Sequence, residues 1–150
     1  MEQERFMRFV NLIDGIHKSI QKIRIDNAAS FGIKSVHIFW VYKLLSHPEG
    51  LSAAELAANN NIDRSLISRE ISALEANGLI KIEKPNGKRN YNSKLTLTEI
   101  GIETATKIKQ LAMNFQSIIG KDVPDGELET FYSVLETFYN KFETLNEEKA

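Results

Sequence analysis

Five residues in the middle of the chain can donate hydrogen bonds from one side of a short helix. They are Arg64, Ser65, Ser68, Arg69 and Ser72. An arginine guanidinium pairs bidentately with the O6 and N7 atoms of guanine, and serine hydroxyls bind bases or phosphates. The set therefore favours contacts with double-stranded DNA, with Arg64 and Arg69 as the candidates for base recognition.

A second group of polar residues surrounds Asn86-Gly87 and is basic. Lys84, Lys88 and Arg89 place three cations there, where they can neutralise phosphates or enter a minor groove. The alternative interpretation is a solvated hairpin whose lysines only maintain solubility. The closeness of these cations to the candidate helix favours a contact with DNA.

Enzyme chemistry has little support in this sequence. It contains no Gly-x-Ser-x-Gly motif, no glycine-rich phosphate loop, no His-Glu-x-x-His and no cysteine. The three histidines, His17, His37 and His47, lie far apart and outside any metal-ligand spacing. We therefore expect no catalytic residue, no metal and no cofactor.

Composition predicts one cytoplasmic domain without a membrane span. A chain of 150 residues, with 42% hydrophobic and 26% charged residues, suits a single globular domain. The longest apolar run, Ile38 to Tyr42, is far shorter than the roughly 18 residues of a membrane helix, and no export signal is expected. The net charge of −1 hides an uneven distribution, because residues 81–94 carry five cations against Glu83 alone. The acidic surplus follows residue 120, which would orient the basic end toward DNA.

Two consecutive helices with amino-terminal caps are expected around the candidate contacts. Residues 52–55 have capping-box spacing and predict a short helix. Asp63 is a good cap for a second helix, which Gly78 ends. The inner face of this second helix is formed by Ile67, Ile71 and Leu74.

A two-stranded hairpin is predicted to follow. Strand patterns on either side of Asn86-Gly87, over 79–82 and 91–97, are typical of a tight hairpin, because both residues tolerate positive φ. A lone hairpin must pack on helices to be stable. The order of capped helix, break, capped helix and hairpin is that of a winged helix-turn-helix, a mainly α fold of about six helices with a two-stranded wing.

Four more helices complete the predicted fold. Apolar residues recur at spacings of three and four from Phe6 to Ile23, and residues 34–46 are apolar nearly all round. Thr98 begins a helix that stops at Gly120, and Pro124 suits the first position of the last helix.

The two terminal helices predict a dimer. The last helix carries a seam with coiled-coil spacing, which a monomer would expose. Packing of the first helix on the last within one chain is the alternative, and symmetric dimers are the commoner solution. The residues assigned to the dimer contact are Phe6, Val10, Ile13, Leu128, Phe131, Leu135, Phe138 and Phe142.

Four central segments together carry a family resemblance: LSAAELA (51–57), IDRSLISR (62–69), LEANGLI (74–80) and LTEIG (97–101). They resemble the MarR family of bacterial and archaeal transcriptional regulators. The resemblance implies one domain over 1–150, with a winged helix-turn-helix at 34–97 and dimerisation helices at 4–27 and 98–146. It places Ser65, Ser68 and Arg69 on the recognition helix.

The resemblance also implies a function and a ligand. Family members typically act as homodimeric repressors on an operator, here expected to be palindromic, and many release it when a small aromatic or phenolic effector binds. His37, Trp40 and Tyr42 are the candidate effector contacts, with an aromatic core helix as the alternative. A winged helix that contacts only proteins is the other function considered.

The wing departs from the family pattern. Ile82 replaces the arginine usual after the Gly-Leu-Val motif, and the sequence Asn86-Gly87-Lys88-Arg89 replaces an Asp-x-Arg group. The aspartate that would orient the wing arginine is missing. Lys88 and Arg89 retain the positive charge.

Overall fold

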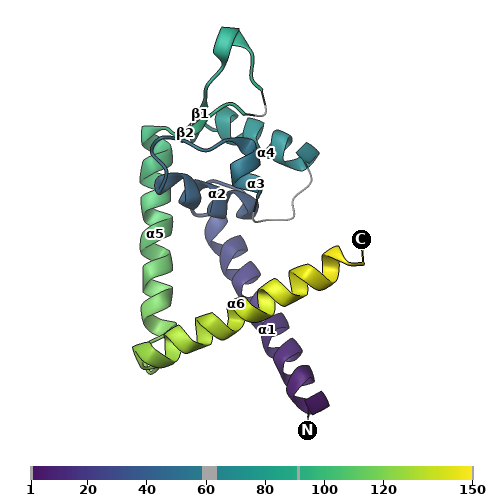
Figure 1. The fold of residues 1–150 in the computed structure, drawn as a ribbon. Coiled ribbons are helices and arrows are strands. Elements are labelled where there is room, and N and C mark those ends of the chain that lie inside the picture. The colour runs from purple at the N-terminus through teal and green to yellow at the C-terminus, as the bar shows by residue number, and fades with distance from the viewer. Residues whose placement is uncertain (1, 59–63, 91, 150) are drawn as a thin grey trace. The chain divides into compact units, whose positions relative to one another are not determined.

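The computed structural model describes residues 2–58, 64–90 and 92–149 (Figure 1). Its elements are α1 (Glu2–Ala28), α2 (Ser35–Leu45), α3 (Ala53–Ala57), α4 (Arg64–Ala76), β1 (Ile80–Ile82), the 3₁₀ turn η1 (Pro85–Gly87), β2 (Leu95–Leu97), α5 (Glu99–Ile119) and α6 (Asp125–Glu147). The predicted mainly α fold, with six α-helices and one two-stranded sheet among these residues, is confirmed.

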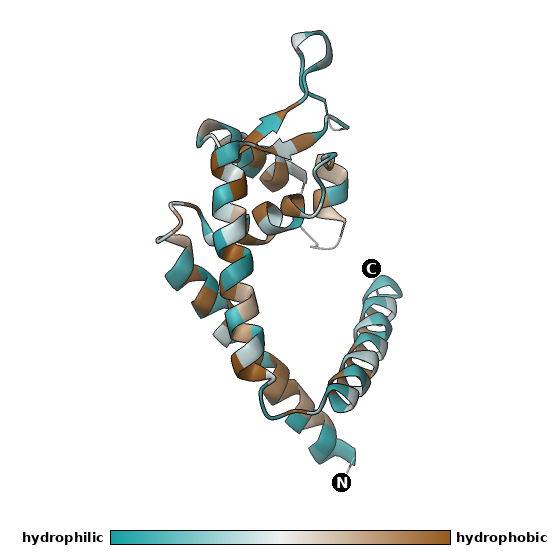
Figure 2. Ribbon diagram, turned by 90° about the vertical axis from the view of Figure 1, so that its left-hand side faces the viewer, coloured by the Kyte–Doolittle hydropathy of each residue, from teal (hydrophilic) through white to brown (hydrophobic). Residues whose placement is uncertain are grey.

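The chain packs as two compact units, Met1–Lys109 and Gln110–Ala150. The expected single domain over 1–150 and its internal boundaries stay predictions. No helix among residues 2–58, 64–90 and 92–149 is long and apolar enough to cross a membrane. Hydrophobic residues recur among hydrophilic ones along the helices (Figure 2), which is the amphipathic pattern of helices that pack on one face.

The core of the first unit is formed by α2, α3, α4 and the sheet. Trp40 and Leu44 on α2 and Leu56 on α3 are at most 2% exposed. The predicted inner face of α4 is confirmed, since Ile67 and Ile71 are buried together with Leu74. Each such side chain contributes about 1.5–3 kcal/mol through the area that it removes from water. This core fixes which side of α4 faces outward.

Two helix starts follow the sequence signals. In the capping box, the Glu55 amide donates to Ser52 Oγ over 3.2 Å, and the Ser52 amide donates to Glu55 Oε2 over 2.6 Å. At α5, the Gly101 amide donates to Thr98 Oγ1 over 3.0 Å. The predicted cap Asp63 lies outside the described residues. Pro124 is the N-cap of α6 and not its first helical residue, because its ψ of 143° is not helical, although its carbonyl accepts bonds from the Glu127 and Leu128 amides.

The hairpin is longer and more open than predicted. β1 and β2 are antiparallel, with Ile80 opposite Leu97 and Ile82 opposite Leu95. The expected tight turn is wrong, because residues 83–94 separate the two strands. The ladder stops just before Lys84-Pro85, where proline has no amide hydrogen to donate. Asn86 (φ 57) and Gly87 (φ 75) do adopt positive φ, but at the tip of a long wing; Tyr91 lies outside the described residues.

Candidate nucleic-acid interface

The outer face of α4 carries the polar side chains that the sequence singled out. Ser65, Ser68, Arg69 and Ser72 are all exposed there, opposite the buried apolar residues of the same helix. The Arg69 side chain is 73% exposed, and its Nε lies 3.8 Å from Glu70 Oε1. Arg64 is the first residue of α4, and its side chain lies outside the described part of the chain. The helix therefore presents one guanidinium and three hydroxyls on the side away from the core.

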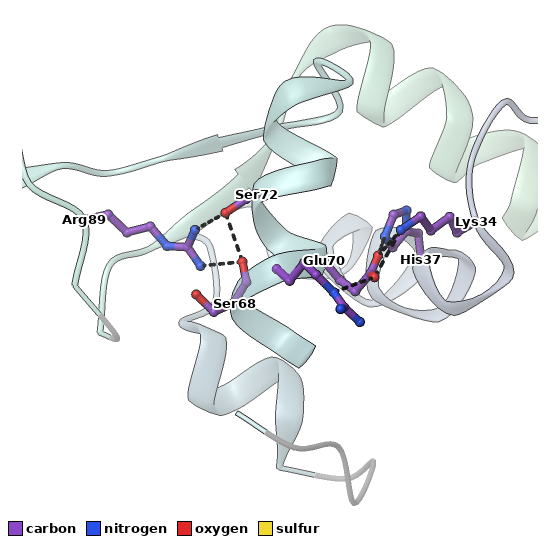
Figure 3. A network of polar contacts seen from close by, with 7 residues as sticks. Lys34, His37, Ser68, Glu70, Ser72 and Arg89 are labelled. Atoms are coloured by element: carbon purple, nitrogen blue, oxygen red, sulfur yellow. Dashed lines mark hydrogen bonds and ion pairs between the residues drawn. The ribbon is translucent and has the colours of Figure 1, made fainter. Parts of the chain in front are cut away.

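The wing is bound to this same face of α4. Arg89 Nη1 donates to Ser72 Oγ over 2.8 Å, and Arg89 Nη2 donates to the Ser68 carbonyl oxygen over 3.4 Å (Figure 3). Ser72 Oγ in turn donates to the Ser68 carbonyl oxygen over 3.0 Å. The sequence did not predict this contact: Ser68, Ser72 and Arg89 are all candidate DNA contacts there, whereas in the structure Ser72 and Arg89 bind each other. Ser68 and Ser72 lie four residues apart on one face of the helix, and this spacing was the one sign in the sequence that a single side chain could contact both.

The other predicted wing cations have different surroundings. Lys84 Nζ lies 2.8 Å from Glu75 Oε1 near the carboxyl end of α4, which gives the wing a second attachment to that helix. Lys88 is exposed beyond η1. A hollow of about 280 Å³ between α3, α4 and the wing is lined by Ala53, Ile67, Ser68, Arg89 and Asn90. The interface thus combines an exposed lysine at the tip with an arginine that borders a hollow beside α4.

The short helix α3 is tied to neighbouring elements through Glu55. Lys94 Nζ lies 3.2 Å from Glu55 Oε2, and Lys43 Nζ donates to the Glu55 carbonyl oxygen over 2.8 Å. Hydrogen bonds from the Ser52 amide and hydroxyl, and then from Lys94, lower the pKa of the Glu55 carboxyl to about 2. The carboxylate is therefore ionised at neutral pH, as the capping box requires.

A buried polar cluster lies on the opposite side of α4 from the wing (Figure 3). His37 Nε2 is 2.6 Å from Glu70 Oε2, and Lys34 Nζ lies 3.1 Å from both oxygens of that carboxylate. Burial lowers the pKa of His37 despite the neighbouring carboxylate. Burial would raise the pKa of Glu70, but the bonds from Lys34 and His37 outweigh it and hold that pKa below its usual range. Glu70 is not among the residues predicted from the sequence, because a single carboxylate near apolar helix positions has no recognisable spacing signal.

The three candidate effector contacts are not equivalent. His37 is fully buried, and Trp40 is 1% exposed with its ring centroid 6.2 Å from that of His37. Tyr42 is 37% exposed. His37 and Trp40 thus behave as core residues of α2, and an effector role for the three stays a prediction.

The residues assigned to dimerisation lie on α1 and α6. On α1, Phe6 is 54% exposed, while Val10 and Ile13 are half-buried. In the second unit, no described residue of α6 is buried. The apolar residues of the predicted coiled-coil seam on α6 are in large part accessible to solvent. The exposed fractions there are 52% for Phe131, 40% for Phe138 and 39% for Phe142, and Leu128 and Leu135 are half-buried.

Comparison with known sequences gives one distant relative. No family model matches the chain. A protein of Thauera aromatica, named as a transcriptional regulatory protein for the hcr operon, is 27% identical over 99 residues. The match covers 65% of this chain and 58% of the relative, so the chain spans little more than half of that protein's length.

Solved structures match a larger share of the chain. A regulator from Listeria monocytogenes, described as a MarR family member and solved with a 26mer DNA, superposes with a TM-score of 0.77 at 20% identity, over 88% of this chain and 87% of that one. Another MarR family transcription regulator superposes with a TM-score of 0.80 at 20% identity, over 98% and 96%. A third, from Methanosarcina mazei, gives 0.73 at 18% identity, over 91% and 90%.

Proposed function

We propose, from the premise that this chain has the fold of the MarR family transcriptional regulators, that it is a sequence-specific DNA-binding regulator and not an enzyme. In this proposal it acts in the bacterial cytoplasm as a homodimer that represses transcription from a palindromic operator. The neighbour solved with a 26mer DNA supports a DNA partner.

One observation carries the proposal: the exposed face of α4 and the basic wing form a single connected surface. Arg69 and Ser65 extend from the first turns of α4, and Arg89 joins the wing to the same helix through Ser72. A helix in the major groove presents its first turns to base edges, whereas cations beside it contact phosphates. The surface therefore has the two kinds of contact that sequence-specific binding needs.

The position of each residue on this surface indicates which part of the DNA it would contact. Arg69, 73% exposed near the start of α4, is suited to bidentate recognition of guanine. Lys88 at the wing tip is suited to a phosphate, because an ammonium group is a compact point charge without a planar fork. Ser65 and Ser68 can bind bases or phosphates from the same helix.

Dimerisation through the terminal helices would place two recognition helices on one duplex. The exposed aromatic side chains of α6 support such a contact, because burying them in a partner removes apolar area from water. A two-fold dimer binds half-sites that lie about one helical turn, roughly 34–36 Å, apart. We therefore expect an inverted repeat as the preferred site.

Regulation by a small aromatic or phenolic effector rests on the family resemblance alone. Fluorescence anisotropy of the DNA complex, with phenol and benzoate as the probes, tests it. A lowered affinity for the selected duplex that leaves random-duplex affinity unchanged would support effector release. Unchanged affinity for both duplexes at millimolar probe would contradict release by these two compounds.

The central experiment is selection from a random duplex library by the purified protein, followed by anisotropy at several salt concentrations. The proposal predicts enrichment of an inverted repeat, bound at least about a thousandfold more tightly than random duplex, with affinity that falls as salt rises. Failure to enrich any motif would refute sequence-specific binding. It would favour the winged-helix module that contacts only proteins.

A further inference from the structure

We propose that Glu70 is a positioning residue whose buried carboxylate ties the recognition helix α4 to the start of α2, and so sets the half-site spacing that the dimer accepts. The inference rests on the proposed DNA-binding function. Its basis is the cluster of Lys34, His37 and Glu70 on the inner side of α4 (Figure 3).

On the side of α4 that faces the core, the Glu70 carboxylate lies among apolar side chains. The Glu70 side chain is 5% exposed, and its helix neighbours Ile67, Ile71 and Leu74 are buried. Apolar contacts are non-directional, so they resist separation of the helix from the core more than small rotations or shifts along it. A hydrogen bond depends steeply on distance and angle. The bonds to Glu70 therefore define an orientation of α4 that the apolar contacts alone leave loose.

The cluster satisfies the charge that it buries. A buried carboxylate is tolerated only with close partners, and Glu70 has His37 at 2.6 Å and Lys34 at 3.1 Å. Among the described residues, His37 Nδ1 has no hydrogen-bond partner. A neutral imidazole that donates from Nε2 leaves only a lone pair unmatched at Nδ1, whereas a protonated ring would leave an unmatched N–H. Lys34 therefore supplies the positive charge, and His37 supplies a directional bond inside the core.

Lys34 connects the cluster to α1. It is the N-cap residue of α2 and follows the turn that ends α1 at Ala28. Ala28 and Ile33 in this turn are buried, and the Ile33 amide donates to the Ala28 carbonyl oxygen over 3.1 Å. The turn is thus packed into the same core as α4. The Glu70 cluster therefore fixes the position of α4 relative to the end of α1. Because α1 is proposed to contact the second subunit, the cluster also fixes α4 relative to the dimer contact.

The cluster also lies next to the proposed base-reading residue. Arg69 Nε is 3.8 Å from Glu70 Oε1, although the guanidinium itself extends into solvent. An error in the orientation of α4 would therefore move Arg69 with it. In a dimer, the same error occurs in both subunits and changes the distance between the two recognition helices.

The test measures spacing preference. Duplexes carry the two half-sites that the wild-type protein enriches from a random library, with the natural spacer or with one or two base pairs added or removed. Anisotropy gives the affinity of wild type, Glu70→Gln and Glu75→Gln for each duplex. Glu75→Gln is the matched control, because it removes one carboxylate charge from α4 outside the Glu70 cluster, where Glu75 lies 2.8 Å from Lys84 of the wing.

For wild type and Glu75→Gln, we expect a changed spacer to weaken binding at least about tenfold, the usual cost of roughly one mismatched base pair. For Glu70→Gln, we expect the loss to shrink to about threefold or less, while the affinity for random duplex stays within about twofold of wild type. A spacer profile for Glu70→Gln equal to that of wild type would overturn the positioning role.

Two variants of Lys34 keep the inference testable if Glu70→Gln fails to fold. The Lys34 side chain is 62% exposed, so its substitution removes no buried side chain from the core. Lys34→Gln should broaden the spacer profile, and Lys34→Arg, which retains charge and donors, should restore it. Equal profiles for both would overturn the inference. A wild-type protein that enriches no motif would instead refute the proposed function, and with it this positioning role.

Discussion

Arg89 in the wing donates a hydrogen bond to the Ser72 hydroxyl on α4 over 2.8 Å. The same guanidinium reaches the Ser68 carbonyl oxygen at 3.4 Å. The family pattern would place an aspartate beside the wing arginine, and this chain has none at the tip. The helix supplies the acceptors instead. The angle of the wing is consequently coupled to α4 and not only to the hairpin.

This coupling predicts non-additive effects on DNA binding. Ser72→Ala and Arg89→Lys should each weaken the selected and random duplexes alike by about 0.5–1.5 kcal/mol, the contribution of one hydrogen bond. The double variant should be little weaker than either single one, because both remove the same contact. Anisotropy titrations of the four proteins measure this coupling. Additive losses would mean that Ser72 and Arg89 act on DNA independently.

Arg69 and Lys88 should affect binding in different ways. Arg69→Ala should lose about 1–3 kcal/mol on the selected duplex and relax base preference at one position of each half-site. Lys88→Ala should weaken all duplexes about equally and flatten the salt slope by about one. Selection and salt titrations on both variants make the comparison. The same loss of base preference from both changes would contradict the division between reading and phosphate binding.

The seam on α6 should be required for the proposed dimer. Leu135→Asp places a charge among Phe131 and Phe138, where burial against a partner would desolvate it, and should give a monomer by light scattering. Ser133→Asp is the matched control, because it adds the same charge to an exposed position off the seam. It should leave the dimer intact. A dimer that survives Leu135→Asp would place the interface elsewhere.

Gly101 should be intolerant of any side chain. A Cβ at this position in α5 would overlap the Leu79 carbonyl oxygen and lie 3.2 Å from Leu97 Cδ2. We expect Gly101→Ala to lower the free energy of unfolding by about 1–3 kcal/mol, because backbone must shift to admit it. Gly15→Ala, in α1 with open space around the position, should instead raise it by about 0.5–1 kcal/mol. Chemical denaturation measures both, and equal effects would contradict the close approach.

The capping box should make stability depend on acid. The pKa of Glu55 is lowered from 4.5 to about 2 by its bonds to Ser52 and Lys94. A carboxyl whose pKa is lowered by folding stabilises the folded state at every pH above its pKa in the unfolded chain. This contribution to the free energy of unfolding is lost as pH falls from about 4.5 toward 2. Thermal unfolding should therefore show wild type more stable than Glu55→Gln at pH 7, with a gap that narrows below pH 4.5. A gap that stays constant down to pH 3 would contradict this role.

Local patterns in the sequence were sufficient to predict those parts of the structure that depend on residues close together in the chain. The capping box at Ser52, a helix start at Thr98 and the inner face of α4 were predicted, since each involves spacing within one or two helical turns, although Thr98 proves to cap α5 and not to be its first residue. The hairpin shows the limit. Asn86-Gly87 predicted a reversal of the chain, but the length of the wing depends on where the strand ladder stops.

The sequence by itself determined the winged-helix order, the outward polar face of α4 and the basic charge of the wing, because periodicity, caps and charge are properties of adjacent residues. The tertiary structure decided which polar side chains meet. Lys34 and Glu70 are separated by 36 positions in the sequence, and Ser72 and Arg89 by 17, so only the packing of the folded chain brings each pair into contact. In the sequence, Glu70 has no distinguishing signal and Ser72 is a candidate DNA contact. Their positions in the fold make one a buried link to α2 and the other the attachment point of the wing.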